Sequence, residues 1–221
     1  MLVIKQLAVI AIQNRIIQPK LETIMCEFIE TSENEILEIN WHGPFSWIGY
    51  ENQNNLDKIP DIEGVYLWTF KYNDGYLIYC AGITNSTKKR FRSHTLEYKS
   101  GNYTVFVVEE AENGKRKEIW HGWSYARAHR EEFNERKEEI LNAVESQLKS
   151  FRVFVAKVPD KRIRARFESA IMKNIYSSKE TWSELADKGM HLAKKKNDEN
   201  IIKIKNTTNY KIYGLPENLE I

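Results

Sequence analysis

The sequence predicts an α/β protein of the α+β type, in which a short antiparallel β-sheet is flanked by helices. Two runs rich in aromatic and β-branched residues, 64–72 and 76–84, enclose Asn73-Asp74-Gly75, and this pattern is a strong signal for a β-hairpin. Residues 151–158 alternate between apolar and polar side chains well enough to predict a third core strand. Residues 161–176 carry apolar side chains at helical spacing, so one face of that helix is expected to be buried.

The chain is long enough for one core with extensions. It has 221 residues, of which 42% are apolar and 12% aromatic, as is ordinary for a globular protein. We expect an N-terminal extension, residues 1–59, that packs on the core. The core spans 60–180 with an insertion at about 103–150, and a C-terminal extension covers 181–221.

Before the hairpin, residues 21–40 alternate apolar and acidic side chains and predict a strand that leads into an aromatic loop. His42 in that loop is interpreted as structural, since a lone histidine beside tryptophan more often serves packing. A helix is expected to follow the hairpin. Thr84, Asn85 or Ser86 can cap its start, and Gly101 ends it.

The remaining elements follow in order. Residues 103–108 and 117–125 predict an inserted hairpin with a turn at 112–115, and residues 125–149 a charged helix with an apolar stripe. Asp160 is expected to cap the helix over 161–176. A helix near 180–196, a short strand around 201–205 and a tail at 212–216 complete the chain.

Cysteine usage and hydropathy bear on the compartment. Cys26 and Cys80 are too far apart to suggest a disulfide framework or a zinc site, which is typical of a reducing environment. The apolar run 2–17 is interrupted by polar residues, too short to span a membrane, and lacks a signal-peptide layout. We therefore expect a cytoplasmic protein with no membrane partner.

Charge is segregated along the chain. The net charge is only +2, but residues 86–130 hold ten basic and five acidic residues, and residues 149–173 hold eight basic and two acidic residues. Positive segments of this kind favour a nucleic-acid partner. The candidate phosphate-contacting residues are Lys88, Lys89, Arg92, Lys115, Arg116 and Lys117.

Short motifs in and after the hairpin suggest a family. Gly64-Val65-Tyr66, then Ala81-Gly82-Ile83-Thr84, then Lys89-Arg90-Phe91 and His94 follow one another in the sequence. Together they resemble the GIY-YIG nuclease superfamily. The resemblance implies a GIY-YIG-type core and a metal-dependent endonuclease that hydrolyses phosphodiester bonds with Mg²⁺ or Mn²⁺. DNA is the expected substrate, and RNA is the alternative.

The resemblance also implies roles for single residues. Tyr66 positions or deprotonates a water, which requires nearby cations to lower its pKa. Arg90 offers a planar fork for the scissile phosphate, and His94 serves as a proton shuttle or phosphate donor. Gly64 and Gly82 permit close packing of the backbone around the site.

The tyrosine of the second motif has two candidates, because an ungapped alignment places it on Cys80 while Tyr79 lies one residue earlier. A two-residue turn at Asp74-Gly75 pairs Tyr66 with Ile83 and places Tyr79 on the same face as Tyr66. A three-residue turn places Cys80 there instead. We favour Tyr79, which then orients water or phosphate.

The metal ligand implied by the resemblance is Glu168, on the helix over 161–176. A Mg²⁺ ion that keeps most of its waters can be held by one carboxylate and the substrate phosphate. The alternative is that Glu168 only pairs with Arg164, one turn earlier. The family commonly has a downstream asparagine, for which Asn197, Asn200, Asn206 and Asn209 are all available.

A different functional class stays open. A catalytically silent module that keeps the fold and binds nucleic acid or another protein also fits the sequence. The cysteine in place of the second-motif tyrosine is the main argument for it.

Overall fold

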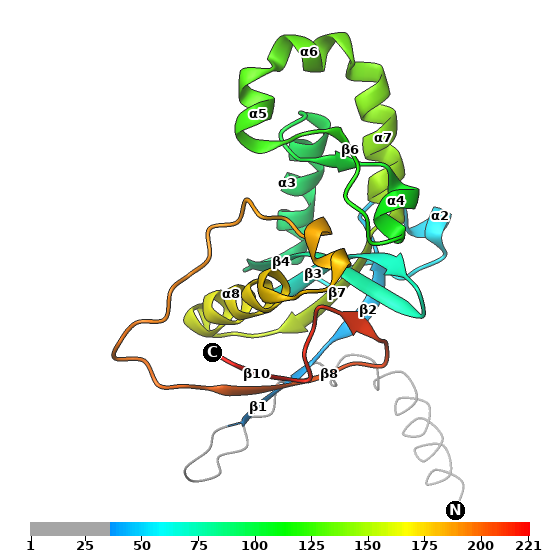
Figure 1. The fold of residues 1–221 in the computed structure, drawn as a ribbon. Helices are drawn as coiled ribbons and strands as arrows, with labels where there is room; N and C mark the ends of the chain where they lie inside the picture. The colour runs from blue at the N-terminus through cyan, green and yellow to red at the C-terminus, as the bar shows by residue number, and fades with distance from the viewer. Residues whose placement is uncertain (1–35) are drawn as a thin grey trace, which may run out of the picture.

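The computed structural model describes residues 36–221 and has a mixed, α+β architecture (Figure 1). The predictions for residues 2–17, for Cys26 and for the start of the 21–40 strand fall outside the described residues. In chain order, the elements are β1 (Ile36–Asn40), β2 (His42–Ser46), α2 (Glu51–Asn54), β3 (Gly64–Tyr72), β4 (Gly75–Thr84), α3 (Thr87–Lys99), β5 (Val105–Phe106), α4 (Val108–Glu112), β6 (Glu118–Trp120), α5 (Trp123–Ala128), α6 (Arg130–Glu135), α7 (Lys137–Ser150), β7 (Arg152–Lys157), α8 (Lys161–Ser177), the 3₁₀ helix η1 (Thr181–Leu185), β8 (Lys203–Thr207), β9 (Ile212–Tyr213) and β10 (Asn218–Glu220).

A five-stranded sheet forms the centre, with the strand order β2-β7-β3-β4-β9. Its first four strands are antiparallel to their neighbours, and β9 runs parallel to β4. A separate three-stranded sheet, β1-β8-β10, joins the N-terminal part of the described chain to its C-terminal part. Both predicted extensions therefore add strands to sheets as well as packing on the core.

The two faces of the central sheet bury different helices. Alternate residues of β3 point to opposite faces, so Tyr66 and Trp68 lie in one apolar cluster with Phe91 of α3, whereas Val65 and Leu67 lie in another with α8 and the three-stranded sheet. Figure 1 shows α3 and α7 on one side of the central sheet and α8 on the other. This two-sided burial explains why β3 reads as a nearly continuous apolar run.

The register of the hairpin differs from the prediction. The turn is Asn73-Asp74, with Tyr72 opposite Gly75 and Tyr66 opposite Gly82, not Ile83. Asn73 adopts the left-handed conformation (φ +47°), which asparagine tolerates better than most residues. Gly75 is the first residue of β4, and only glycine fits there, because a Cβ atom would lie 2.2 Å from the carbonyl oxygen of Lys211.

A β-bulge interrupts the pairing of β3 with β4. Trp68 pairs with Cys80 and Thr69 pairs with Ile78, so Tyr79 is the extra residue of β4. Tyr79 and Cys80 consequently both belong to the apolar cluster that contains Tyr66. The predicted orientation of Cys80 away from Tyr66 is wrong.

Helix ends follow local sequence signals. The Ser86 hydroxyl accepts from the Lys89 N–H (3.3 Å) at the start of α3, and Gly101 has φ +71° just beyond its end. Asp160 accepts from the Ile163 N–H (2.7 Å) at the start of α8. These caps, the strand β7 and the helix α8 confirm the corresponding predictions.

The insertion and the C-terminal part differ more. The expected hairpin consists only of the short strands β5 and β6 with α4 between them, and the expected helix over 125–149 is divided into α5, α6 and α7. The prediction of a helix near 180–196 is wrong beyond η1. Residues 186–196 have no regular secondary structure, and the Asp187 N–H donates to the Tyr79 carbonyl oxygen (2.9 Å) of β4 instead of to a helical carbonyl.

Candidate active site

A cavity of about 80 Å³ lies beside β4, on the face that carries Tyr66. β9 pairs with β4 only at Tyr76 and Leu77, and side chains of α8 cover the edge of β4 farther along. The Ala81 N–H faces Met172 Sδ (3.2 Å), and the Ile83 N–H donates to the Glu168 carboxylate. The cavity is lined by Tyr66, Trp68, Tyr79, Cys80, Ala81, Gly82, Arg90, His94, Tyr98, Tyr103, Trp123, Glu168, Asp187 and Met190.

A chain of hydrogen bonds links Arg90 to Tyr66, His94 and Tyr103. The Arg90 Nε–H donates to the Tyr66 hydroxyl (3.3 Å), because an arginine nitrogen can only donate. The Tyr66 hydroxyl can therefore donate its own proton to His94 Nε2 (2.9 Å), and His94 Nδ1–H then donates to the Tyr103 hydroxyl (3.1 Å). Helix α3 supplies both Arg90 and His94, which lie one turn apart on one face.

The pKa values define the charge states in this chain. Burial, reinforced by the Arg90 charge, lowers the pKa of His94 to about 3, so its imidazole is neutral near pH 7. Burial raises the pKa of Tyr66 above its ordinary value, although Arg90 opposes the shift. The expectation that cations lower the pKa of Tyr66 is thus wrong for this arrangement, and Tyr66 is a neutral phenol near pH 7.

Gly82 makes room for the Tyr66 ring. A Cβ atom at Gly82 would lie 2.2 Å from Cζ and from the hydroxyl oxygen of Tyr66, a distance that non-bonded atoms do not tolerate. Gly64 approaches β7 in the same way, since its Cβ would lie 2.0 Å from the Ala156 carbonyl oxygen. The two motif glycines therefore permit close packing, as the sequence predicts.

We expect Gly82→Ala to destabilise the protein by about 1–3 kcal/mol, because the added methyl group must displace the Tyr66 ring. Denaturant-induced unfolding measures this change. In a Tyr66→Leu background the same methyl group meets a smaller side chain, so Gly82→Ala should cost less there. An equal cost in both backgrounds would show that the ring does not require the glycine.

Glu168 is half-buried at the cavity, and burial raises the pKa of its carboxyl to about 7, against the opposing influence of Arg90 and the Ile83 N–H. Arg164 is turned elsewhere. It donates to Asn85 Oδ1 (2.6 Å) and to Glu63 (3.2 Å), in addition to the Val158 carbonyl oxygen. The alternative interpretation, in which Glu168 serves only to pair with Arg164, is therefore wrong.

Tyr79 and Cys80 both line the cavity. The Tyr79 ring is nearly parallel to those of Trp68 and Phe151, and burial raises the pKa of its hydroxyl. The Cys80 thiol lies 3.6 Å from Met190 Sδ, and burial raises its pKa as well. Because both residues line the cavity, both remain candidates for the tyrosine of the second motif that the resemblance implies.

Asp187 and Trp123 are cavity residues that the sequence analysis missed. Asp187 is 6% exposed, and its carboxylate accepts from the Gly189 N–H (2.9 Å) and from the Trp123 indole N–H. Burial raises its pKa. No hydrophobic periodicity in the sequence marks either residue as part of a site. Trp123 comes from the insertion and Asp187 from the segment after η1, and only the fold brings these two parts of the chain together.

The candidate asparagines lie elsewhere among the described residues. Asn206, for example, is a residue of β8 in the three-stranded sheet, where it accepts from the Trp41 indole N–H (2.9 Å) and donates to the Pro216 carbonyl oxygen (2.8 Å). Asp187 is the polar residue downstream of Glu168 that lines the cavity.

The basic candidates fall into two groups. Lys88, Lys89 and Arg92 are exposed on α3, beside Arg90. Lys115 and Lys117 each lie 3.9 Å from Glu110. Gly114 packs against Tyr72, at the end of β3. Tyr72 lies roughly 25 Å along this strand from Gly64, which is at the end near the start of α3.

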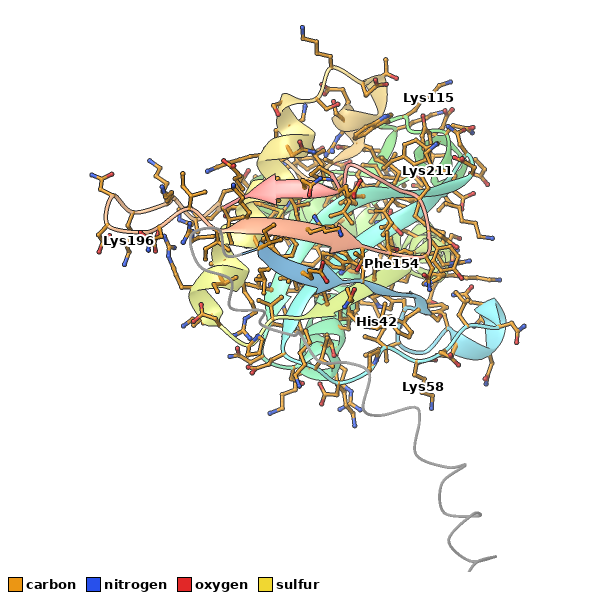
Figure 2. All side chains as sticks on the ribbon, turned by 90° about the horizontal axis from the view of Figure 1, so that it is seen from below. His42, Lys58, Lys115, Phe154, Lys196 and Lys211 are labelled. Atoms are coloured by element: carbon orange, nitrogen blue, oxygen red, sulfur yellow. The ribbon has the colours of Figure 1, made fainter. Side chains whose placement is uncertain are left out.

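Figure 2 places Lys115 and Lys211 on the same side of the molecule, and Lys211 contacts Asp74 in the hairpin turn (3.2 Å). Residues 115–117 therefore lie near the turn rather than at the start of α3. Arg116 is also engaged, since it pairs with Glu118 (2.6 Å) and donates to the carbonyl oxygens of Leu185 and Ala186. The role of residues 115–117 in phosphate binding stays a prediction. Tyr103 and Trp123 are the residues that the insertion contributes to the cavity wall.

Comparisons with protein-family models, curated proteins and solved structures found no match for the chain. None of the helices between residues 36 and 221 is long and apolar enough to cross a membrane. The same residues contain no group of three or more histidine, cysteine, aspartate or glutamate side chains arranged to hold a metal ion.

Proposed function

We propose that the protein is a GIY-YIG-type nuclease that hydrolyses phosphodiester bonds, with DNA as its expected substrate and Mg²⁺ or Mn²⁺ as its metal. The observation that carries the proposal is one cavity lined by Tyr66, Arg90, His94 and Glu168. These residues come from β3, α3 and α8, so their meeting does not follow from proximity in sequence.

Glu168 fits the role of metal ligand. Its carboxylate is partly withdrawn from water, and the raised pKa means that the ionised form lacks enough compensation. A divalent cation supplies that compensation, and one carboxylate with substrate oxygens and waters suffices for Mg²⁺. When bound, such a cation offsets negative charge that develops on the phosphate during hydrolysis.

Arg90 is placed to bind the phosphate. Its Nε–H donates to Tyr66, and its terminal nitrogens make no hydrogen bond within residues 36–221, so they are available to phosphate oxygens. Because the side chain is exposed, an extended substrate can reach it. Arg90 thereby stabilises charge on the phosphate while it also fixes the Tyr66 hydroxyl.

Tyr66 orients the attacking water in this proposal. Its hydroxyl accepts from Arg90 and donates to His94 Nε2, which leaves one lone pair for a water proton. The neutral state of Tyr66 makes it an orienting group rather than a phenolate base. His94 is 3% exposed and both its nitrogens are engaged, so it is a positioning residue for Tyr66 and not a phosphate donor.

The test is metal-dependent cleavage. Purified protein should nick or cut plasmid DNA with Mg²⁺ or Mn²⁺ and stop when EDTA is added. The second candidate, a silent nucleic-acid-binding module, is favoured by Cys80 opposite Trp68, where the resemblance leads one to expect a tyrosine. Salt-dependent binding of many DNA substrates without cleavage in either metal would support that candidate.

Binding should depend on α3 more than on the tip of the insertion. We expect the triple change Lys88→Ala, Lys89→Ala and Arg92→Ala to weaken DNA binding and to reduce the slope of log K against log salt by about 0.9 per lost phosphate contact. Fluorescence anisotropy at several salt concentrations measures both. The matched control is the double change Lys115→Ala and Lys117→Ala, which should leave the slope nearly unchanged. A larger effect of the control pair would place the DNA at the hairpin turn instead.

A further inference from the structure

A groove of about 480 Å³ lies along the side of α8 that faces away from the candidate active site. Arg166, Ala170, Lys173 and Ser177 line it, and they share one face of the helix because they recur every three or four residues. Glu168 lies about 200° around the helix from Arg166, so it points to the opposite side, where it lines the cavity. Helix α8 therefore carries two distinct sites.

The segment between η1 and β8 separates this groove from the cavity. Met190 lines the cavity, whereas Lys195, farther along the segment, lines the groove. Figure 1 shows the segment, in orange, passing outside α8, and Arg162 of α8 donates to the Lys194 carbonyl oxygen (2.6 Å). The two sites are thus neighbours, about 10–12 Å apart if the thickness of one helix separates them.

Positive charge gathers in the groove. Among the described residues that line it, Arg166, Lys173 and Lys195 are basic, and Glu220 is the one acidic side chain. Lys173 and Lys195 are exposed, and neither makes an ion pair or a hydrogen bond with residues 36–221. Their ammonium groups are available to a negatively charged partner.

A cluster of charges beside the groove adds to this excess. Arg166 is 7% exposed, and its Nη2–H donates to the Asn200 carbonyl oxygen (2.7 Å). Its Nε lies 3.9 Å from the Glu199 carboxylate, which also pairs with Arg162. One carboxylate cannot balance two guanidinium groups, so a positive charge remains next to the two lysines.

The composition of the wall suits phosphates rather than bases. Ser177 and Asn174 supply uncharged polar groups, and no aromatic side chain among residues 36–221 lines the groove. Proteins bind bases by stacking them on aromatic rings, whereas lysine, arginine, serine and asparagine contact phosphates. From Arg166 to Ser177 the groove follows α8 for about 16 Å, and each strand of a duplex carries one phosphate per about 3.4 Å of its axis. Several phosphates of one strand therefore fit along it.

We propose that this groove is a further DNA-binding surface, which holds the phosphodiester backbone of duplex DNA away from the scissile phosphate. Lys173 and Lys195 pair with phosphates and release their counterions, so the surface adds affinity without reading sequence. A duplex can reach both sites, since its major groove alone is about 12 Å wide. The inference rests on the proposed function, because it takes the same DNA molecule to be bound at Arg90.

The double change Lys173→Ala and Lys195→Ala tests the groove. Both side chains are exposed, so the variant should fold. The full chain is titrated with a duplex of about 24 base pairs, about 80 Å long, in EDTA so that hydrolysis does not interfere. Fluorescence anisotropy should show weaker binding, and the slope of log K against log salt should fall by about 1.8, or about 0.9 for each lost phosphate contact.

The matched control is the double change Lys161→Ala and Lys179→Ala, which removes two exposed lysines near the ends of α8 that do not line the groove. It should keep the wild-type slope. An equal loss in both double variants would overturn the groove and assign the effect to diffuse surface charge. Loss of affinity for polyglutamate but not for DNA would also overturn it, in favour of an acidic polypeptide.

The triple variant of α3 separates this inference from the proposed function. If that variant weakens DNA binding while the Lys173 and Lys195 changes leave affinity and slope as in the wild type, the groove is overturned and the proposed function stands. If the wild type binds no DNA, the proposed function fails, and the DNA-binding groove fails with it.

Discussion

Glu168→Gln should abolish metal-dependent cleavage of plasmid DNA without unfolding the protein. Glutamine keeps the size of the side chain and a carbonyl oxygen, but it removes the negative charge that a divalent cation requires. Since burial disfavours the ionised carboxyl, the neutral variant should unfold at the same temperature as the wild type or higher at pH 8. Single-turnover cleavage and thermal unfolding measure the two effects separately.

Glu184→Gln is the matched control for this prediction. Glu184 is 69% exposed and pairs with Lys188 (2.6 Å) outside the cavity wall, so its change should leave cleavage unaffected. A Glu168→Gln variant that cuts as fast as the wild type would show that Glu168 holds no metal.

The same carboxyl sets an expected pH dependence. Its pKa is raised to about 7, so the ionised form that binds a cation predominates above that pH and is lost as the pH falls through it. Wild-type cleavage should therefore fall about tenfold for each pH unit well below 7 at low metal concentration. A higher Mg²⁺ concentration should move the midpoint to lower pH, because metal and proton compete for one group. If the midpoint pH of cleavage does not change with the Mg²⁺ concentration, the titrating group is not Glu168.

The features that the sequence predicts correctly depend on signals within a few neighbouring residues. The Ser86 and Asp160 caps, the Gly101 terminus and the apolar spacing of α8 depend on neighbours within a few residues, and each is present as expected. The strand β7 was also recognisable, because its alternation is bounded by Pro159.

The hairpin register was not accessible in this way. Asn73-Asp74 and Asp74-Gly75 are both acceptable turns, and local sequence does not choose between them. The bulge that places Tyr79 and Cys80 in one apolar cluster is a second irregularity of the same hairpin. A pattern of alternation cannot reveal such a bulge, because it assumes an uninterrupted period of two.

The cavity wall after η1 was missed for a related reason. Residues 180–196 have a composition that suits a helix, but the Asp187 N–H donates to the Tyr79 carbonyl oxygen of β4, and the segment after η1 has no regular secondary structure. Arg116 adds to this by binding the carbonyl oxygens of Leu185 and Ala186. These contacts join parts of the chain that are far apart in sequence, and so they override local helix propensity.

Arg90→Lys should reduce the rate of cleavage by about 10²–10³, although the positive charge is kept. Lysine cannot present a planar fork to the phosphate, and it lacks the Nε–H that donates to the Tyr66 hydroxyl. Loss of one donor aimed at developing charge typically has an effect of this size. DNA affinity and its salt dependence should change little, because the number of positive charges on α3 is the same.

Arg92→Lys is the matched control, since Arg92 is exposed on the same helix but does not line the cavity. It should cleave at nearly the wild-type rate. Single-turnover rates at saturating protein separate the chemical step from binding, so a loss confined to the rate supports a role for Arg90 at the phosphate. If instead both variants lose affinity equally and cleave normally once DNA is bound, Arg90 is only one more basic residue of a DNA-binding surface.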